Sequence, residues 1–161
     1  MKKLVAMIFL VVLLPLIGCT TTNEKATPLH VVEIFFDSYS RGDGNTLVSC
    51  MSGEAIAEIN DYVITLQQTP ESSAEYLNSI GIQVSIEDIE TLTAGNFVTL
   101  IFNSPVYAAE LPDFSNAEFG EVTIVDNRAI VPVTIDNNTE PIELIIENDE
   151  WKIVGNNVGI L

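Results

Sequence analysis

Alternation of apolar and polar residues in the last third of the chain places the strongest limit on its fold. Two apolar series stand at every second position, and short runs rich in Asp and Asn separate them from their neighbours. The series are Ala129, Val131, Val133 and Ile135, and then Ile142, Leu144 and Ile146. A period of two is typical of a strand that buries one face. The pattern therefore predicts an antiparallel meander with one buried face and one partly wet face.

The runs between these series have the composition of hairpin turns. Turns are predicted at Asp126-Asn127, which is able to take positive φ, and at 136–139 and 148–150. The last turn leads into a strand that begins at Trp151. Pro132 lies inside the strand that follows Asp126-Asn127. Because proline cannot donate a ladder hydrogen bond, we expect that strand to lie at an edge there or to carry a bulge.

Apolar residues at three- and four-residue spacing predict a helix at the start of the domain. Thr27 is a suitable N-cap, and Pro28 suits the first helical position. The apolar stripe of this helix consists of Leu29, Val32, Phe35, Phe36 and Tyr39. The run 41–44, with two glycines, ends the helix. A turn is expected from Asn45 to Met51.

Two further helices are predicted before residue 82. Ser52 caps the first, which extends to about Gln67. The second starts at 69–71 and closes at Gly81, as helices commonly do at a C-terminal glycine. We expect its inward-facing residues to be Tyr76, Leu77 and Ile80.

The middle of the chain leaves alternatives open. Residues 82–86 have the character of a short strand, whereas Ser85 to Leu92 resembles a helical turn that starts with a capping box, with Asp88 in the place of glutamate. Thr93 caps a further short helix, which 103–105 stops. A loop is expected from Val106 to Ala117.

A sheet with one apolar face must bury that face against something. The upstream helices are the available cover, so the sequence predicts an α+β domain with N-terminal helices packed on a curved, cone-shaped antiparallel sheet. The meander strands occupy the C-terminal half.

The first eighteen residues predict an export signal. Lys2 and Lys3 precede an apolar run from Leu4 to Ile17, which is too short to span a bilayer as a helix. Gly18-Cys19 follows this run and resembles the lipobox of prokaryotic lipoproteins, in which the cysteine is acylated after cleavage. The resemblance implies a fatty acid such as palmitate on Cys19. The alternatives are an uncleaved signal anchor and a free cysteine that happens to follow Gly18.

These features predict three segments. Residues 1–18 are the signal peptide, 19–27 are the lipidated cysteine and a polar tether, and 28–161 form a single domain. The expected location is the cell membrane or outer membrane, with the domain facing outside the cytoplasm. Two acyl chains on Cys19 would make that attachment stable.

The charge of the domain restricts its partners. Removal of the leader leaves four Lys and Arg against 23 Asp and Glu, a formal charge of −19. Such a surface disfavours nucleic acid, whose recognition depends on Lys and Arg, and it is repelled by anionic lipid head groups. It attracts calcium or a basic partner, or it acts only as a solvated coat that maintains solubility.

The order of helices and strands, together with two local motifs, carries a resemblance. The predicted helix that starts at Pro28 has the aromatic run 32–39 followed by Arg41-Gly42-Asp43, and the last strand opens with a charged turn and Trp151. From about Thr27 to Gly155 this arrangement resembles the cone-shaped nuclear transport factor 2-like superfamily. It is most similar to the lumazine-binding-like prokaryotic lipoproteins of unknown function in that group. The superfamily includes isomerases and dehydratases with acid–base residues inside the cone.

The sequence has no recognisable catalytic constellation. Its single histidine, His30, lies beside the tether, and the inward strand positions carry no Asp or Glu. Asp136, Asn138 and Glu140 alternate like calcium ligands, but Pro141 stands where a calcium loop needs glycine. Cys50 has apolar neighbours, which favour burial of its thiol. We therefore predict a non-enzyme without cofactor or metal.

Aromatic residues are the candidates for a ligand site. They either line an apolar cavity between helices and sheet or simply fill the core. The candidate lining residues are Phe35, Phe36, Tyr39, Tyr62, Tyr76, Phe97, Phe102 and Trp151.

Three functions follow from these alternatives. The first is a non-catalytic domain that binds a small ligand or a protein partner. The second is an isomerase- or dehydratase-type enzyme, which would need buried, mutually bonded polar groups in a cavity. The third is an envelope interaction module that acts as a homodimer through an exposed apolar patch around Ile130 and Ile145.

Overall fold

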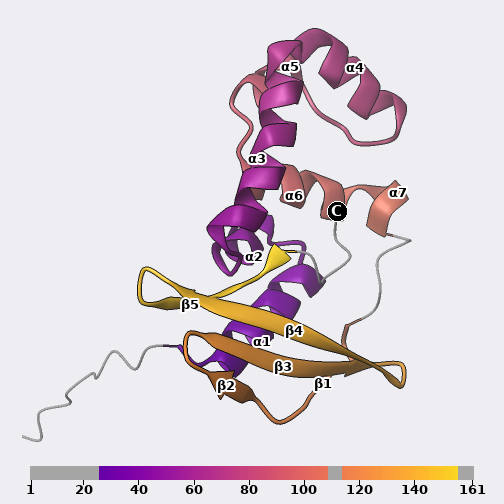
Figure 1. Cartoon of the computed structure of the whole chain (residues 1–161). Helices are drawn as coiled ribbons and strands as arrows, with labels where there is room; N and C mark the ends of the chain where they lie inside the picture. The colour runs from indigo at the N-terminus through magenta and orange to yellow at the C-terminus, as the bar shows by residue number, and fades with distance from the viewer. Residues whose placement is uncertain (1–25, 109–113, 156–161) are drawn as a thin grey trace, which may run out of the picture.

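Helices come first along the chain and strands follow, as Figure 1 shows. The structure is a computed structural model, and it describes residues 26–108 and 114–155. The helices are α1 (Pro28–Ser40), α2 (Gly44–Ser49), α3 (Gly53–Gln68), α4 (Pro70–Ser79), α5 (Ile86–Glu90), α6 (Ala94–Asn103) and α7 (Pro105–Ala108). The strands are β1 (Glu118–Phe119), β2 (Thr123–Val125), β3 (Arg128–Ile135), β4 (Asn138–Glu147) and β5 (Glu150–Ile153). The α+β prediction is confirmed.

Side-chain caps start most of the predicted helices where the sequence placed them. Thr27 Oγ1 accepts a hydrogen bond from the backbone N–H of His30 at 3.2 Å, and Ser52 Oγ accepts one from Ala55 at 3.3 Å. Thr93 caps α6 in the same manner. Each cap satisfies a backbone donor that has no partner within the helix, so these residues determine where the chain enters the helical conformation.

The expected turn from Asn45 to Met51 is wrong, because residues 44–49 form α2. Gly42 takes a φ of +66° and ends α1. Asp43 then acts as an N-cap, and its carboxylate accepts the N–H of Thr46 at 3.1 Å. The fully buried Leu47 anchors the short helix in the core. A polar cap and one apolar contact are therefore sufficient for a helix too short to show periodicity.

The alternatives for the middle of the chain are resolved in favour of helices. The capping box forms at Ser85: its Oγ accepts the N–H of Asp88 at 3.1 Å, and the Asp88 carboxylate accepts the N–H of Ser85 at 2.8 Å. This box starts α5, and no strand forms over 82–86. Part of the expected loop after Val106 is also helical, since α7 covers Pro105–Ala108.

The strands form one antiparallel sheet in the order β1-β3-β4-β5, with β2 also paired to β3. Two hairpins turn through pairs of residues with positive φ, Asp136-Asn137 and Asn148-Asp149. Asp126 also has positive φ, in the turn between β2 and β3. These left-handed conformations fit the twist of the flanking strands, which is why Asn and Asp occupy the turns.

Pro132 lies opposite Pro141 in the β3–β4 ladder. Neither proline has a backbone N–H, so Pro132 and Pro141 form no N–H···O hydrogen bond with each other. On its other side the Pro132 carbonyl accepts the N–H of Gly120 at 2.8 Å. Phe119 of β1 pairs with Val133, and Thr123 of β2 pairs with Ile130. Residues 120–122 between them therefore stand opposite only two residues of β3, Val131 and Pro132. β3 is therefore paired on both sides and is not an edge strand, and the bulge-like extra residue lies between β1 and β2 rather than in β3 itself.

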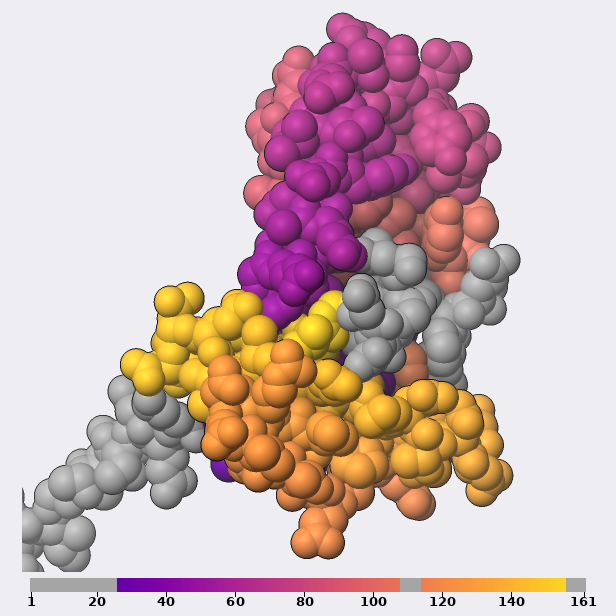
Figure 2. Space-filling model, viewed as in Figure 1, coloured from indigo at the N-terminus to yellow at the C-terminus, as the bar shows by residue number. Residues whose placement is uncertain are grey.

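Only part of the helical half covers the sheet. α1 packs against β3 and β5. Val32 and Phe35 of α1, Val131 of β3 and Ile153 of β5 have no exposed surface. In contrast, α3, α4, α5 and α6 (residues 53–103) lie beyond the sheet, and Figure 2 shows the upper helices projecting from it. α3, α4 and α5 pack on one another, whereas α6 packs on α2 and α3 and so joins these helices to the rest of the domain. We call α3, α4, α5 and α6 the helical lobe.

The inner face of the sheet is less fully covered than predicted. Ile124 is 54% exposed and Ile146 is 39% exposed, although Ile124 pairs with the buried Ala129 and Ile146 stands two residues after the buried Leu144. Both residues lie close to hairpin turns. Over residues 26–108 and 114–155, no helix combines the length and apolar character needed to cross a membrane.

Candidate functional site

The predicted pocket residues separate into two groups in space. The first group is buried and consists of Phe35, Phe36, Tyr39 and Phe102. The ring centroids of Tyr39 and Phe102 lie 4.5 Å apart, and Phe114 contacts both Tyr39, at 4.6 Å, and Phe36, at 4.9 Å. Burial raises the pKa of the Tyr39 phenol. In this group the rings pack against one another between α1 and the neighbouring elements.

The second group lies on the helical lobe. The Tyr62 ring of α3 contacts the buried Phe97 of α6, with centroids 5.1 Å apart. Tyr62 is 44% exposed and Tyr76 of α4 is 54% exposed. The expectation that Tyr76 faces inward is wrong: Ser73, Ala74 and Leu77 occupy the inner side of α4 and leave Tyr76 on the outer side.

A third tyrosine, Tyr107, belongs with the second group. Burial raises the pKa of the Tyr62 phenol, and the nearby phenols of Tyr76 and Tyr107 raise it further. Sequence reasoning missed Tyr107 because it falls in a segment expected to be a loop, whereas α7 holds it beside the lobe. Three helices therefore bring three tyrosines near one another, and of these Tyr62 packs on Phe97. We call Tyr62, Tyr76 and Tyr107 the tyrosine patch.

Trp151 lies apart from these helices, on β5 opposite Ile146. Its side chain is half-buried and packs against the core. A small open hollow of about 230 Å³ lies elsewhere, between α5 and α6. Its lining consists of Asp88, Thr91, Leu92, Asn96, Thr99 and Leu100, and thus of none of the predicted pocket residues.

Charge is distributed unevenly between the lobe and the rest of the domain. The lobe has eight carboxylates and, in residues 53–103, no Lys, Arg or His. They are Glu54, Glu58, Asp61, Glu71, Glu75, Glu87, Asp88 and Glu90. The described cations pair outside the lobe: Arg41 with Asp37, Arg128 with Glu143, and Lys152 with Glu150. The tyrosine patch therefore lies in a strongly negative field.

The carboxylates with shifted pKa values are held in the ionised form. The hydroxyl of Ser85 lowers the pKa of Asp88, hydrogen bonds from Thr46 lower that of Asp43, and Lys152 lowers that of Glu150. A general acid at neutral pH requires the opposite shift. The roles of these three groups are a capping box, a helix N-cap and an ion pair.

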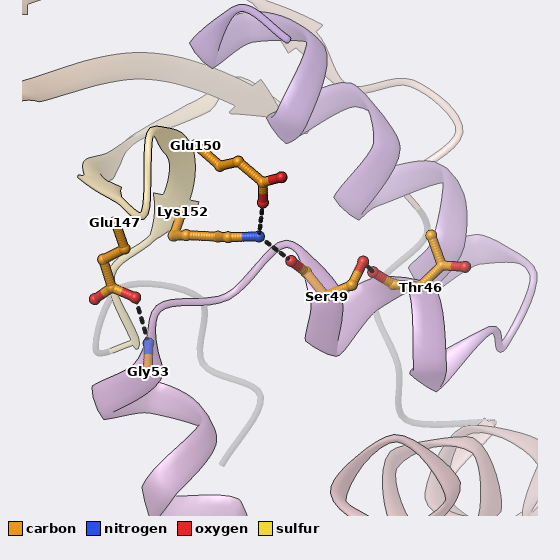
Figure 3. Close-up of polar contacts among 6 residues, drawn as sticks. All are labelled: Thr46, Ser49, Gly53, Glu147, Glu150 and Lys152. Atoms are coloured by element: carbon orange, nitrogen blue, oxygen red, sulfur yellow. Dashed lines mark hydrogen bonds and ion pairs between the residues drawn. The ribbon is translucent and has the colours of Figure 1, made fainter. Parts of the chain in front are cut away.

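Polar contacts around β5, drawn in Figure 3, connect segments distant in sequence. Lys152 Nζ donates to the Ser49 carbonyl at 2.9 Å and lies 2.7 Å from Glu150 Oε2. Glu147 Oε2 accepts the N–H of Gly53 at 2.8 Å. Residues 50–52 also run along the outer edge of β5, bonded through the backbone of Ile153. These contacts cover a sheet edge, so their role is structural.

The remaining candidates are isolated. His30 is exposed and lies 3.7 Å from Glu33. Cys50 is buried as predicted, and burial raises the pKa of its thiol. Across the described ranges, no three His, Cys, Asp or Glu side chains gather closely enough to hold a metal ion. Cys19, the predicted lipidation site, lies outside the described residues.

Comparison of the chain with family models, with curated proteins and with solved structures found no match.

Proposed function

We propose that the protein is a membrane-anchored lipoprotein, lipidated at Cys19 and facing outside the cytoplasm, whose non-catalytic domain binds a protein partner through the tyrosine patch. The anchor rests on the charged start, the short apolar run and the Gly18-Cys19 junction of the leader. The domain would be a variant of the nuclear transport factor 2-like fold, enlarged by the helical lobe. That kinship rests on the α1-on-sheet arrangement.

One observation carries the binding role: α3 and α4 present the exposed rings of Tyr62 and Tyr76, and the half-buried Tyr107 of α7 lies near them. Soluble domains rarely expose several large aromatic side chains together without use, and tyrosine is enriched among the residues that dominate binding energy at interfaces. The buried group of Phe35, Phe36, Tyr39 and Phe102, in contrast, already has partners within the fold. Among the predicted pocket residues, the second group is therefore the one available to a partner.

Site-specific photocrosslinking in the native membrane tests this function. A photoreactive phenylalanine analogue at position 76 should give an adduct whose crosslinked peptide maps to residues 70–79. The same analogue at position 130, on the sheet, is the comparison, since Ile130 is also exposed. Adducts from neither position would contradict a binding role for both surfaces.

The anchor has its own test. Metabolic labelling with an alkyne fatty acid should label the wild-type chain, and Cys19→Ser should abolish the label. Cys50→Ser is the matched control because it removes the other cysteine of the chain and should leave the label unchanged. A label that persists in Cys19→Ser would rule out lipidation at this position.

A second candidate function is supported by the outer face of the sheet. Val125 is 63% exposed and Ile130 is 41% exposed, while Ile145 is half-buried. The three lie on one face, since Val125 pairs with Arg128, Ile130 with Thr123 and Ile145 with Arg128. This surface matches the interaction module predicted around Ile130 and Ile145. If the protein forms a homodimer through this sheet face, the photoreactive analogue at position 130 should crosslink two copies of the chain, and the analogue at position 76 should not.

A further inference from the structure

The tyrosine patch is a preformed platform. α3 and α4 meet at Thr69, and the Ser73 hydroxyl donates to the Leu66 carbonyl at 2.8 Å across that junction. Gly81, just past α4, lies so close to Val106 of α7 that a Cβ there would be 2.7 Å from Val106 Cγ2. Phe97 supports the Tyr62 ring from beneath. Side chains on packed helices lose little freedom when a partner binds, which favours recognition.

Carboxylates border this platform. Glu58 stands one helical turn before Tyr62, on the same face of α3. Glu75 precedes Tyr76 directly in sequence and projects from the neighbouring side of α4. Both side chains are exposed. Neither Lys, Arg nor His occurs between Gly42 and Asn127, so the chain provides no cation of its own within that stretch.

The combination of aromatic faces and negative charge selects the kind of partner. The face of a tyrosine ring carries negative electrostatic potential and attracts a cation placed over it. Arginine fits this arrangement best because its planar guanidinium stacks on a ring while its N–H groups reach neighbouring carboxylates. A second copy of this chain would bring the same negative lobe, and anionic lipid would be repelled.

We propose that the tyrosine patch binds an arginine-containing segment of a protein partner, with guanidinium groups stacked on Tyr62 and Tyr76 and paired with Glu58 and Glu75. This inference rests on the proposed binding function and adds the chemistry of the partner. Coulombic attraction by the lobe would also accelerate the encounter.

The test uses the full chain in neutral detergent micelles and an amidated nine-residue peptide that alternates arginine with glycine. Calorimetric titration at low salt should detect binding. The same peptide with citrulline in place of arginine keeps the shape without the charge and should bind at least tenfold more weakly. Equal binding of the two peptides would overturn the proposal.

Variants locate the site. Tyr62→Ser combined with Tyr76→Ser should weaken binding about fivefold or more, as expected from the loss of two exposed cation–π contacts. Tyr76→Ser alone changes the more exposed position and should also weaken binding, so it tests the site even if the double variant folds poorly. Glu58→Gln with Glu75→Gln should weaken binding more than Glu118→Gln with Glu121→Gln, which removes the same charge near the sheet edge. Unchanged affinity in the tyrosine variants, or equal effects of the two Glu pairs, would reduce the interaction to nonspecific attraction and contradict the proposal.

The outcomes separate this inference from the proposed function. A crosslink from position 76 in the membrane, without binding of the arginine peptide, would retain the binding role and reject the arginine-containing partner. Absence of a crosslink from position 76, with site-specific peptide binding, would reject the cellular role while the recognition chemistry holds.

Discussion

Glu147 Oε2 accepts the backbone N–H of Gly53 at 2.8 Å, and 94 residues separate the two in sequence. The contact places a carboxylate of β4 at the first residue of α3, where backbone N–H groups have no partner within the helix. The positive end of the helix dipole adds to the attraction. The β4–β5 hairpin thus holds the base of the helical lobe.

Glu147→Ala should lower the free energy of unfolding by about 1 kcal/mol, the usual value of one hydrogen bond. Urea denaturation followed by far-UV circular dichroism measures this change. Glu143→Ala is the control on the same strand, where a 3.7 Å contact with the exposed Arg128 should contribute less than about 0.5 kcal/mol. Equal losses in the two variants would mean that the Gly53 contact has no special role.

Lys152→Met should also destabilise the domain, by about 1 kcal/mol, because the ammonium donates to the Ser49 carbonyl while only 22% of its side chain is exposed. The same substitution removes the group that lowers the pKa of Glu150, so that pKa should rise towards its ordinary value of 4.5. NMR titration of the Glu150 carboxyl carbon reports this shift. An unchanged titration would show that Lys152 and Glu150 do not pair in solution.

The capping box of α5 should make a pH-dependent contribution. The folded protein lowers the pKa of Asp88 below its ordinary value of 3.8, so the stabilisation is present above that pH and is lost as pH falls through the folded pKa. Asp88→Ala should therefore be less stable than wild type at pH 6, and the difference should shrink towards pH 2. Glu87→Ala is the control, since it removes a neighbouring charge that lies outside the capping box and should not give the same pH dependence. A difference for Asp88→Ala that stays constant with pH would contradict the ionised cap.

Gly44→Ala should cost about 1–3 kcal/mol because its new Cβ would overlap the Gly95 carbonyl and the Thr99 N–H of α6. The matched control is Gly53→Ala at the first position of α3, where the nearest atom would be Glu147 Oε2 at 3.5 Å. We expect that change to stay within about 0.5 kcal/mol. Thermal denaturation of the Gly44→Ala and Gly53→Ala proteins measures the difference. Equal melting temperatures of these two variants would contradict the close α2–α6 contact.

Cys50 should resist alkylation in the folded protein. Its thiol is buried, and burial raises its pKa, so the reactive thiolate is scarce. In the Cys19→Ser chain, iodoacetamide at pH 8 should modify Cys50 only after urea unfolds the domain. Rapid modification under native conditions would contradict the buried position.

Much of the fold follows from local sequence signals. The caps Thr27, Ser52 and Thr93 and the capping box at Ser85 act within three residues of themselves, so the positions of their helices could be predicted. The hairpin turns behave in the same way, since Asn and Asp accept positive φ in any chain. Helix α2 was missed because six residues are too few to show an apolar period.

The candidate site was predicted less well, because it depends on which helix faces meet. The spacing of Tyr62, Tyr76 and Phe97 marks them as aromatic helix residues but leaves open whether each packs inward. Tyr76 faces outward only because Leu77 and Ala74 take the inner side of α4. Tyr107 joins the patch because α7 lies beside the end of α4.

The sequence by itself determined that helices precede strands, where the capped helices begin, where the hairpins turn and that acid is in surplus, because each depends on neighbouring residues or on composition alone. The tertiary structure decided that α1 covers the sheet while the next helices project from it, and that one set of aromatic rings is buried while another is exposed. The physical reason is that burial is a property of pairs of surfaces: a side chain becomes core only when a distant element arrives to cover it.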